Sequence, residues 1–426
     1  MPPSAPRFLL PLFGRSVAVL GDGLSGSGAL ALLEAAGAEG TVYDAKGAEF
    51  SPEAARRHLL AVFSPGFPPS HPWLAAARRA GCVCLGELDF AGLFWRGRLV
   101  AVTGTNGKTT LVEFLTRALE SAGTGAVAAG NIGRAFSKVV AETGGGEGTT
   151  AVCEVSSFQA ETLRHLRPDA LLWTNFAEDH LERHGTMEAY FAAKANLAAR
   201  SRRVFAGLSV KAFAGGGDGR SLPPETIWVA TEGRPSVRGL EGTAFSHYPQ
   251  RENFLLGAAW WNDSGLDPDA LVEAARSFRT GRHRLEKIAE VAGVAYWDDS
   301  KATNFHAVEA ALSGFASPVL LIAGGRSKGG DVAGFVGRIS PKVRRAFLIG
   351  ETGPELARAC GAARLPCASC ATLAEAVRGA AEAARPGEEV VLSPGFASFD
   401  MFQSYEDRGE QFAALVRGLA AEAPLI

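Results

Sequence analysis

Short apolar runs that end in glycine or proline alternate with alanine-rich stretches along most of the chain. This alternation predicts an α/β protein with mostly parallel sheets, because each strand is followed by a helix that returns the chain to the same edge. Two of the runs end in the same tripeptide, at Ser64–Gly66 and at Ser393–Gly395. Ligands bind beyond the carboxyl ends of such strands, so both turns are predicted to line a cleft.

The pattern falls into three blocks, and at 426 residues the chain is too long for one ordinary core. The second block begins with the strand LVAVTG at Leu99, and its stretch Ala206–Arg238 is rich in glycine and proline and weakly patterned. The third block follows FRTGRHRLE. We therefore expect three domains, at residues 1–98, 99–280 and 281–426, with a hinge near Arg279–Gly281.

The segment Met187–Ala199 is predicted to be a helix, because it is rich in alanine and contains neither glycine nor proline. One face of this helix carries five residues: Met187, Tyr190, Phe191, Lys194 and Leu197. Lys194 therefore lies in the middle of the face expected to be buried. Two hypotheses are open at this point. Either the stem lies on the apolar surface with the ammonium in water, or burial favours the uncharged amine, which can then react.

Composition and charge exclude several classes of partner. Hydrophobic residues make up 47% of the chain and charged residues 21%, with a net charge of -2. Basic residues are spread out and form no platform with aromatic residues, so neither nucleic acid nor membrane is an expected partner. The N-terminal FLLPLFG is too short to span a membrane and lacks the features of a signal peptide. The six cysteines show no zinc-finger spacing, and we expect reduced thiols in the cytoplasm.

The strongest chemical signal is VTGTNGKTT, in which a predicted strand runs into a glycine-rich turn and then into the helical LVEFLTRALE. Backbone N–H groups of such a turn, together with the helix N-terminus, form a nest for polyphosphate. Lys108 is expected to neutralise the β- and γ-phosphates, and Thr109 to offer its hydroxyl to Mg²⁺. The usual spacing would place a glycine where this chain has Val102. The order of strand, glycines, lysine and helix still favours nucleotide binding over a chance turn.

Further polar residues follow the neighbouring strands of the second block. Glu154 ends the strand AVCEV, and Asp179 and His180 follow the strand LLWTN. Parallel strands would deliver these side chains to the phosphates, where Glu154, His180 and the threonine of the turn could form the shell of Mg²⁺. By itself, His180 would more often be a hydrogen-bonded structural residue. Its position in the nucleotide-binding block favours contact with a metal or substrate.

The first block contains a second glycine pattern, Gly21-x-Gly23-x-x-Gly26, followed by Asp44 at the end of TVYD. Taken by itself, this pattern would indicate a dinucleotide fold and an NAD-dependent enzyme, with Asp44 on a ribose. A dehydrogenase has no use for the phosphate loop in the next block, however. A nucleotide bound without redox chemistry agrees better with both motifs.

Charged loops follow predicted strands in the third block. They are HRLE (His283–Glu286), DDSKATN (Asp298–Asn304) and GGRSKGGD after the strand VLLIA. Positive charge at the ends of strands is suited to anions such as a phosphate or a substrate carboxylate. Any one of these loops could be an ordinary solvated turn, but three in one domain favour a binding site.

Together these motifs resemble the Mur ligase family. The segments that carry the resemblance are TGTNGKTT, GNIG (Gly130–Gly133), EVSSFQ (Glu154–Gln159), DHLERHGTMEAYFAAK, HRLE, DSKATN, GGRSKGGD and SPGFASFDMFQSYEDRGEQF. They span the whole chain in the family's order, and within the family they are similar to the ligases that add D-glutamate.

The resemblance implies a Rossmann-like N-terminal domain that binds UDP, a central P-loop ATPase domain and a Rossmann-like C-terminal domain. The implied reaction adds D-glutamate to UDP-N-acetylmuramoyl-L-alanine in peptidoglycan precursor synthesis. ATP phosphorylates the substrate carboxylate, and the amine of D-glutamate then attacks the acyl phosphate. Mg²⁺ is the implied cofactor, and a cytoplasmic monomer with small-molecule substrates only is expected.

The resemblance also implies roles for individual residues. The implied ATP site comprises Gly104, Thr105, Asn106, Gly107, Lys108, Thr109, Thr110, Asn253, Arg284, Asp299 and Lys301. The implied UDP-substrate site comprises Leu24, Ser25, Asp44, Ser64, Asn131 and Gln159. D-glutamate would contact Thr303, Lys328, Ser398, Phe399 and Tyr405. The implied metal ligands are Thr109, Glu154, His180 and Lys194, and the implied catalytic residues are Lys108, His180, Lys194 and Asn131.

In this family the lysine at the position of Lys194 carries CO₂ as a carbamate that positions Mg²⁺. Burial gives this modification a physical basis, since only the uncharged amine reacts with CO₂ and a metal stabilises the anionic product. The resemblance therefore favours the reactive hypothesis for Lys194 over the solvated one.

Two segments depart from the pattern of the D-glutamate-adding ligases. Gly395-Phe396 replaces the usual Ala-Cys, and Pro249-Gln250 stands before Asn253 where His-Asn is common. Three alternatives stay open: a sister Mur ligase, a ligase like folylpolyglutamate synthase, and a catalytically silent nucleotide-binding paralogue. The sequence lacks the D-N-P-R stretch expected of the diaminopimelate-adding relative. A silent paralogue would have no reason to keep Lys108, Glu154, His180 and Lys194.

Overall fold

The computed structural model describes residues 2–215, 222–230 and 239–422. The chain forms two compact units, and each is described by itself below. The first unit comprises residues 1–176, 188–243 and 252–278, and the second comprises residues 177–187, 244–251 and 279–426. The weakly patterned stretch Ala206–Arg238 lies partly outside the described residues.

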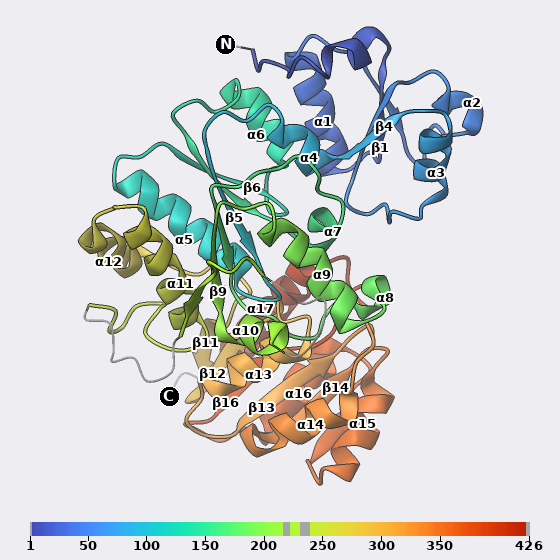
Figure 1. The fold of residues 1–426 in the computed structure, drawn as a ribbon. Helices are drawn as coiled ribbons and strands as arrows, with labels where there is room; N and C mark the ends of the chain where they lie inside the picture. Colours follow the sequence, from blue (N-terminus) through green and yellow to red (C-terminus); the bar gives the residue numbers. More distant parts are fainter. Residues whose placement is uncertain (1, 216–221, 231–238, 423–426) are drawn as a thin grey trace. The chain divides into compact units, whose positions relative to one another are not determined.

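The first unit begins with a four-stranded parallel sheet in the order β2-β1-β3-β4 (blue in Figure 1). Its strands are β1 (Val17–Leu20), β2 (Gly40–Tyr43), β3 (Leu60–Phe63) and β4 (Val83–Gly86). The helices of this part are η1 (Leu10–Gly14, 3-10), α1 (Leu24–Ala35), α2 (Pro52–Ala55), α3 (Pro72–Arg79) and α4 (Glu87–Gly92). Strands β1 and β3 are buried throughout, as expected of strands covered on both faces.

The rest of the first unit is built on a six-stranded parallel sheet in the order β10-β9-β8-β5-β7-β6. Its strands are β5 (Arg98–Thr103), β6 (Ala126–Gly130), β7 (Thr150–Glu154), β8 (Ala170–Trp173), β9 (Arg203–Gly207) and β10 (Ile227–Val229). The accompanying helices are α5 (Lys108–Ser121), α6 (Phe136–Thr143), α7 (Ser157–Ala160), α9 (Met187–Ala198), α10 (Leu208–Ala214), α11 (Gln250–Asp263) and α12 (Pro268–Ser277). Helices α5 and α12 pack side by side (Figure 1).

Two buried carboxylates connect the two sheets of the first unit through α4. The Glu87 carboxylate accepts hydrogen bonds from the N–H and the hydroxyl of Ser137 at the start of α6. Asp89 accepts from the N–H groups of residues 164, 165 and 166. Helices α1 and α6 also pack closely, since a Cβ on Gly28 would come within 2.5 Å of the Ser137 hydroxyl. This packing holds together the two sheets whose strand ends carry the predicted site residues.

The second unit contains a six-stranded sheet in the order β11-β12-β16-β13-β14-β15, parallel except for the β11–β12 pair. Its strands are β11 (Glu286–Val291), β12 (Val294–Asp298), β13 (Val319–Gly324), β14 (Val343–Ile349), β15 (Cys367–Ser369) and β16 (Glu389–Leu392). Its helices are α8 (Leu181–His184), α13 (Phe305–Ser313), α14 (Val332–Ile339), η2 (Ser340–Lys342, 3-10), α15 (Gly353–Ala362), α16 (Leu373–Ala383) and α17 (Tyr405–Glu422).

Apolar residues cover both faces of this third sheet. Along β13, Leu321 belongs to the core on one side, whereas Leu320 and Ile322 belong to the core on the other. Helices α14 and α15 pack next to each other, as do α16 and α17 (orange to red in Figure 1). The predicted α/β class with mostly parallel sheets is therefore confirmed.

The helix predicted around Lys194 is also confirmed, as α9. Of the five residues predicted to share its inner face, Tyr190, Phe191, Lys194 and Leu197 are buried, and Met187 is half-buried. The Lys194 side chain is only 1% exposed, so its ammonium does not reach solvent. Of the two hypotheses for this lysine, the solvated one is wrong.

Candidate active site

The phosphate loop follows β5, the strand that lies between β8 and β7 in the central sheet. In this sheet Val102 is paired with Glu154, and Thr103 with Trp173. The carboxyl ends of three strands therefore meet at one edge, which places the loop Gly104–Gly107 between Glu154 and the residues that follow β8. Helix α5 begins directly after the loop, at Lys108.

Only glycine is suited to two positions of this loop. Gly104 and Gly107 have φ values of 148° and 80°, a region that residues with a side chain rarely adopt. A Cβ on Gly107 would also come within 2.6 Å of the side-chain oxygen of Asn253, which is buried on α11. Asn253, which the resemblance places in the ATP site, thus lies against the turn that starts α5.

Two lysine side chains donate to one carbonyl oxygen of the loop. Lys108 Nζ lies 3.0 Å from the carbonyl oxygen of Gly104 and 2.8 Å from that of Thr105. Lys194 Nζ lies 2.9 Å from the same Gly104 oxygen and 3.4 Å from the Thr103 hydroxyl. Lys194 also lies over the Tyr190 ring, 4.9 Å from its centroid. The structure therefore brings together the two lysines that were predicted to be catalytic.

The carboxylate of Glu154 contacts two further residues of the predicted site. Its Oε2 accepts from the Thr109 hydroxyl at 2.7 Å, and its Oε1 accepts from the side-chain amide of Asn131 at 2.9 Å. Asn131 belongs to the turn after β6, and its own N–H donates to the Glu154 carbonyl. Glu154 thus joins the start of α5 to the turn that carries Asn131.

These oxygen donors are suited to Mg²⁺. Within the described residues, no group of three or more histidine, cysteine, aspartate or glutamate side chains is placed to hold a metal. A divalent cation at the Glu154 carboxylate and the Thr109 hydroxyl could take further ligands from phosphate oxygens. A mixed set of carboxylate, hydroxyl and phosphate oxygens is what Mg²⁺ prefers. Of the two other residues predicted to bind the metal, Lys194 belongs to the first unit and His180 to the second.

The predicted UDP-contacting residues of the first block gather at the carboxyl edge of the first sheet. Leu24 and Ser25 start α1 after β1, Asp44 follows β2, and Ser64 follows β3. Leu24 is 74% exposed. The N–H groups of Lys46 and Asp22 hold the pKa of Asp44 below its ordinary value.

Ser64 has a feature that itself points to a ligand. Its hydroxyl oxygen is buried, yet it has no hydrogen-bond partner among the described residues. A buried hydroxyl is normally hydrogen-bonded, because leaving it unpaired costs about 1–3 kcal/mol. This observation is consistent with the predicted contact between Ser64 and a substrate diphosphate.

Gln159 has a structural role that the sequence analysis did not foresee. Its side-chain oxygen accepts from the N–H and the hydroxyl of Ser156, while Ser156 accepts from the N–H of Gln159. This reciprocal pair is a capping box that starts α7. The S-x-x-Q spacing of Ser156 and Gln159 was the signal that could have revealed it. The Gln159 side chain is thus largely committed to its own helix.

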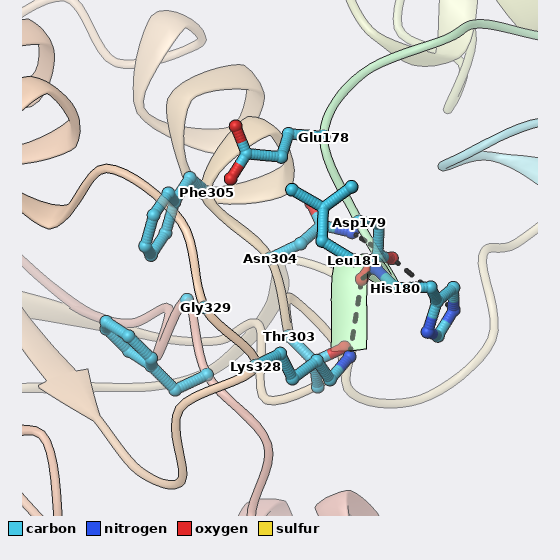
Figure 2. Close-up of a pocket in the computed structure, with 11 residues that line it drawn as sticks. Glu178, Asp179, His180, Leu181, Thr303, Asn304, Phe305, Lys328 and Gly329 are labelled. Carbon is cyan, nitrogen blue, oxygen red and sulfur yellow. Dashed lines mark hydrogen bonds and ion pairs between the residues drawn. The ribbon is translucent and has the colours of Figure 1, made fainter. Parts of the chain in front are cut away.

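A pocket in the second unit is lined by two of the five residues predicted to contact D-glutamate, Thr303 and Lys328 (Figure 2). The lining residues are Glu178, Asp179, His180, Leu181, Thr303, Asn304, Phe305, Lys328, Gly329, Gly395 and Phe396. Asp179 is central to this set. Its carboxylate accepts from the Asn304 amide at 3.1 Å and pairs with Lys328 Nζ at 3.6 Å. Thr303 and Lys328, both predicted to contact D-glutamate, are therefore part of one pocket.

His180 lies next to the same carboxylate, with 3.7 Å between its Nε2 and Asp179. Its backbone is in the left-handed region, with φ 55°, and its N–H donates to Asp179. Burial lowers the pKa of His180; Asp179 opposes this effect and Lys328 adds to it. The neutral imidazole, which is the form that can accept a proton or bind a metal, is therefore favoured.

Phe396, one of the departures noted above, forms an apolar wall of this pocket. Its side chain is only 2% exposed, and its ring packs edge-on against Phe305 at 5.3 Å. Phe305 in turn stacks on Phe335 at 4.3 Å. Of the other residues predicted to contact D-glutamate, Ser398 and Phe399 belong to the loop after β16, and Tyr405 starts α17. Ser398 is buried, Phe399 is 67% exposed, and the Tyr405 ring lies 3.7 Å from Lys301 Nζ.

Sequence reasoning missed the buried charged residues that hold these loops. Arg408 on α17 is fully buried and donates to the carbonyl and hydroxyl oxygens of Ser300 and to the Phe396 carbonyl. His283 Nδ1 lies 2.6 Å from the Asp298 carboxylate. The predicted nucleotide contact Arg284 is half-buried beside them. The only signal for Arg408 was its place in the DRGEQF segment, where a charged residue would normally be read as solvated.

Asp299, predicted to contact the nucleotide, is buried and hydrogen-bonded within the unit. Its carboxylate accepts from the Ser393 hydroxyl at 2.7 Å and from the Leu285 N–H at 3.1 Å. Burial raises the pKa of Asp299 from 3.8 to about 7; the two hydrogen bonds oppose the rise and Asp298 adds to it. At pH values between 3.8 and about 7, the folded protein therefore binds more protons than the unfolded chain.

This difference in proton binding predicts how stability depends on pH. The free energy of unfolding should fall as pH rises from about 4 to about 7, by at most about 1.4 kcal/mol per pH unit from this one group. Asp299→Asn cannot ionise, so thermal unfolding of the variant over this range should show a flatter pH dependence than the wild type. Parallel curves for the two proteins would contradict the prediction.

Comparison with known proteins agrees with this arrangement. The Mur ligase middle domain matches residues 102–206, and the Mur ligase glutamate ligase domain matches residues 283–396. A UDP-N-acetylmuramoylalanine–D-glutamate ligase of Gloeobacter violaceus is 37% identical over 434 residues, covering 97% of this chain and 96% of the relative. The chain belongs to the Mur ligase family. The recognition of this family from the sequence motifs is confirmed.

Other Mur ligases extend the comparison. A UDP-N-acetylmuramoylalanine–D-glutamate ligase of Acidobacterium capsulatum is 33% identical over 97% of this chain and 99% of its own length. Among solved structures, the ADP complex of the MurF ligase of Thermotoga maritima has a TM-score of 0.59 at 16% identity. It covers 88% of this chain and 97% of that one. The UDP-N-acetylmuramate–alanine ligase MurC of the same organism has a TM-score of 0.60 at 15% identity. The match covers 95% of this chain and 99% of the MurC chain. These structures support the fold.

Membership in the Mur ligases confirms the predicted enzyme class, an ATP-dependent ligase that forms an amide bond. Among the described residues, no helix is long and apolar enough to cross a membrane.

Proposed function

We propose that the protein uses ATP to join D-glutamate to UDP-N-acetylmuramoyl-L-alanine through an acyl phosphate, in the synthesis of peptidoglycan precursors. The observation that carries the proposal is the convergence of Lys108 and Lys194 on the Gly104 carbonyl, beside the Glu154–Thr109 pair. The names of the relatives, matched over nearly the whole chain, support the choice of substrates.

The proposal assigns a task to each part of the chain. Residues 1–98 bind UDP at the carboxyl edge of the first sheet, residues 99–280 bind ATP, and residues 281–426 bind D-glutamate and part of the ATP. The diphosphate of the substrate contacts Ser64 and Asn131, and the unpaired Ser64 hydroxyl supports this. Asn131 is tied to Glu154, so the substrate and the phosphates of ATP share one supporting carboxylate.

In the first chemical step the terminal carboxylate of the UDP substrate attacks the γ-phosphorus of ATP, and ADP leaves. Lys108 neutralises the developing charge on the transferring group, and the N–H groups at the start of α5 bind the phosphates. Lys108 donates to the carbonyl oxygens of Gly104 and Thr105. Phosphate oxygens are stronger acceptors than these carbonyls, so the ammonium can turn to them without leaving the loop.

In the second step the amine of D-glutamate attacks the acyl phosphate, and phosphate leaves. Lys328 and Thr303 line the pocket that would orient the carboxylates of D-glutamate. Asp179 holds Lys328 and His180 in place, and burial favours the neutral imidazole of His180, the form that the proposed metal contact requires. The departing phosphate can take up the proton that the attacking amine must lose. Phe396 makes the pocket wall apolar, which excludes water that would hydrolyse the intermediate.

Mg²⁺ remains the proposed cofactor, held by Glu154 and Thr109, with His180 and a modified Lys194 as the other proposed contacts. When bound, the metal supplies positive charge to the phosphates. We propose that the uncharged Lys194 amine adds to CO₂, forming a C–N bond and releasing one proton. Two of its present partners, the Gly104 carbonyl and the Thr103 hydroxyl, are neutral oxygen atoms. We also expect a monomer in the cytoplasm.

Phosphate release from ATP by the purified protein would test the function. The reaction contains Mg²⁺ and UDP-N-acetylmuramoyl-L-alanine, with D-glutamate, L-glutamate, other amino acids or no acceptor. We expect release that depends on both the UDP substrate and D-glutamate. If a different amino acid supported phosphate release, the protein would still be a ligase, but the proposal that its pocket binds D-glutamate would be wrong. ATP binding without release in any mixture would favour the silent paralogue.

A further inference from the structure

Asn175, two residues after the end of β8, contacts three main-chain groups of the phosphate loop. Its carbonyl oxygen accepts from the Thr105 N–H at 3.1 Å. Its side-chain oxygen accepts from the Asn106 N–H at 2.9 Å, and its side-chain nitrogen donates to the Asn106 carbonyl at 3.2 Å. The neighbouring Thr174 hydroxyl donates to the same carbonyl at 2.6 Å. Neither residue belongs to the site predicted from the sequence.

These contacts decide which way the peptide planes of the loop face. In a trans peptide the C=O and the following N–H point in opposite directions. The N–H groups of Thr105 and Asn106 point to Asn175, so the carbonyls of Gly104 and Thr105 point away from it, where Lys108 and Lys194 bind them. The next plane is reversed. The Asn106 carbonyl points to Asn175 and Thr174, so the Gly107 N–H points away from them.

The reversal at Asn106 matters for an anionic ligand. The Gly107 N–H can join the N–H groups at the start of α5 in binding phosphate only while the Asn106 carbonyl is held on the other side. If this peptide flipped, a carbonyl oxygen would replace an N–H at the nest and would repel the phosphates. Gly107, with no side chain and φ 80°, offers little steric resistance to such a flip.

We propose that Asn175 is a positioning residue for ATP, which fixes the polarity of the phosphate loop by holding the Asn106–Gly107 peptide with its carbonyl turned away from the phosphates. Thr174 supports it through the shared acceptor. Asn175 itself contacts no nucleotide in this account and acts only through the loop. The inference rests on the proposed function in one respect, namely that the loop binds ATP.

Replacing Asn175 tests this role. Asn175→Ala removes both side-chain hydrogen bonds, and we expect KM for ATP to rise by roughly tenfold, the factor typical for the loss of one or two buried hydrogen bonds. The KM values for the UDP substrate and for D-glutamate should change less than twofold. Thr174→Ser keeps the hydroxyl and should bind ATP like the wild type, whereas Thr174→Val should raise KM for ATP.

A second variant distinguishes a role in ATP binding from a role in stability alone, because only the first predicts a pH-dependent KM for ATP. In Asn175→Asp, the ionised carboxylate places a negative oxygen against the Asn106 carbonyl, whereas the protonated acid restores a donor there. The ratio of its KM for ATP to that of the wild type should therefore fall as pH is lowered from about 9 to about 5, the range over which a buried aspartate can take up a proton. The same ratio for Asn175→Ala should not depend on pH.

Asn196 provides a matched control in the same unit. Its side-chain amide donates to the main-chain carbonyls of Ala160 and Leu163, at 2.7 Å and 3.1 Å, far from the phosphate loop in the sequence. Asn196→Ala should lower the melting temperature about as much as Asn175→Ala and leave KM for ATP unchanged. Equal changes in KM for ATP in both variants, or a KM within twofold of the wild type in Asn175→Ala, would overturn the inference.

Calorimetric titration with ADP and Mg²⁺ separates this inference from the proposed function. If the wild type binds no nucleotide, the proposed function fails. If the wild type binds ADP and folded Asn175→Ala and Asn175→Asp bind it equally well, only the role of Asn175 is wrong. Weaker binding by both variants, with the pH dependence confined to Asn175→Asp, is the expected result.

Discussion

Lys108→Ala is expected to lower kcat/KM for ATP by at least about a thousandfold, the scale on which removing one preorganised charge stabiliser slows a phosphoryl transfer. The Lys108 side chain donates to two carbonyls of the loop. Lys108 is also the first residue of α5, where its positive charge would face the phosphates of the nucleotide. Steady-state phosphate release would measure the loss, and titration with ADP would measure how much of it comes from weaker binding.

The fold should survive this substitution. Lys108 is only half-buried, and alanine is a better helix former than lysine at the start of α5. Lys211→Ala is a suitable control, because Lys211 is an exposed lysine on α10 whose ammonium lies over the Trp228 ring. The control should keep wild-type kinetics. If Lys108→Ala turned over at nearly the wild-type rate, the loop would have no place in the mechanism.

Lys194→Ala should be nearly inactive, and small carboxylates such as acetate should partly restore its activity. The substitution removes the amine that would carry CO₂ and leaves a buried space beside the Thr103 hydroxyl and the Tyr190 ring. Acetate can place a carboxylate there in the position of the proposed carbamate. Activity measured against acetate concentration, with the melting temperature as a check on folding, would test this.

Lys194→Arg keeps the positive charge but cannot form a carbamate, so full activity in this variant would refute the modification. A direct measurement is ¹³C NMR of the wild type in labelled bicarbonate, in which a carbamate carbon should appear and should be missing from Lys194→Ala. Without that resonance, restored activity with acetate would have to be explained by packing alone.

The parts of the site that depend on local sequence could be predicted. The strand, glycines, lysine and helix around Lys108 are contiguous, and the buried place of Lys194 follows from helical periodicity. The gathering of Leu24, Asp44 and Ser64 at one edge follows from the rule that strands of a parallel sheet end on the same side.

Contacts that depend on the order of the strands could not be predicted. Asn175 meets Asn106 because β8 is the neighbour of β5, and the sequence does not state which strands are neighbours. Arg408 is a second example, since burial of a charged residue on α17 depends on the two loops that it joins, at Ser300 and Phe396. Gln159 is a third example, because its sequence motif did not reveal that its side chain also caps its own helix.

The two hydrogen bonds to the Gly104 carbonyl oxygen bear on how the affinity for ATP would depend on CO₂. Lys108 and Lys194 donate to this one atom, so two amino groups share one acceptor. Forming the proposed carbamate would remove Lys194 as a donor, and the phosphates of ATP would draw Lys108 away from the shared oxygen. The carbamate and the phosphates are both proposed contacts of Mg²⁺, so each would favour the other through the metal, and by linkage the effect would be mutual. With the proposed carbamate, dissolved CO₂ would be coupled to nucleotide affinity, and the ATP concentration needed for half-saturation should rise as bicarbonate is depleted.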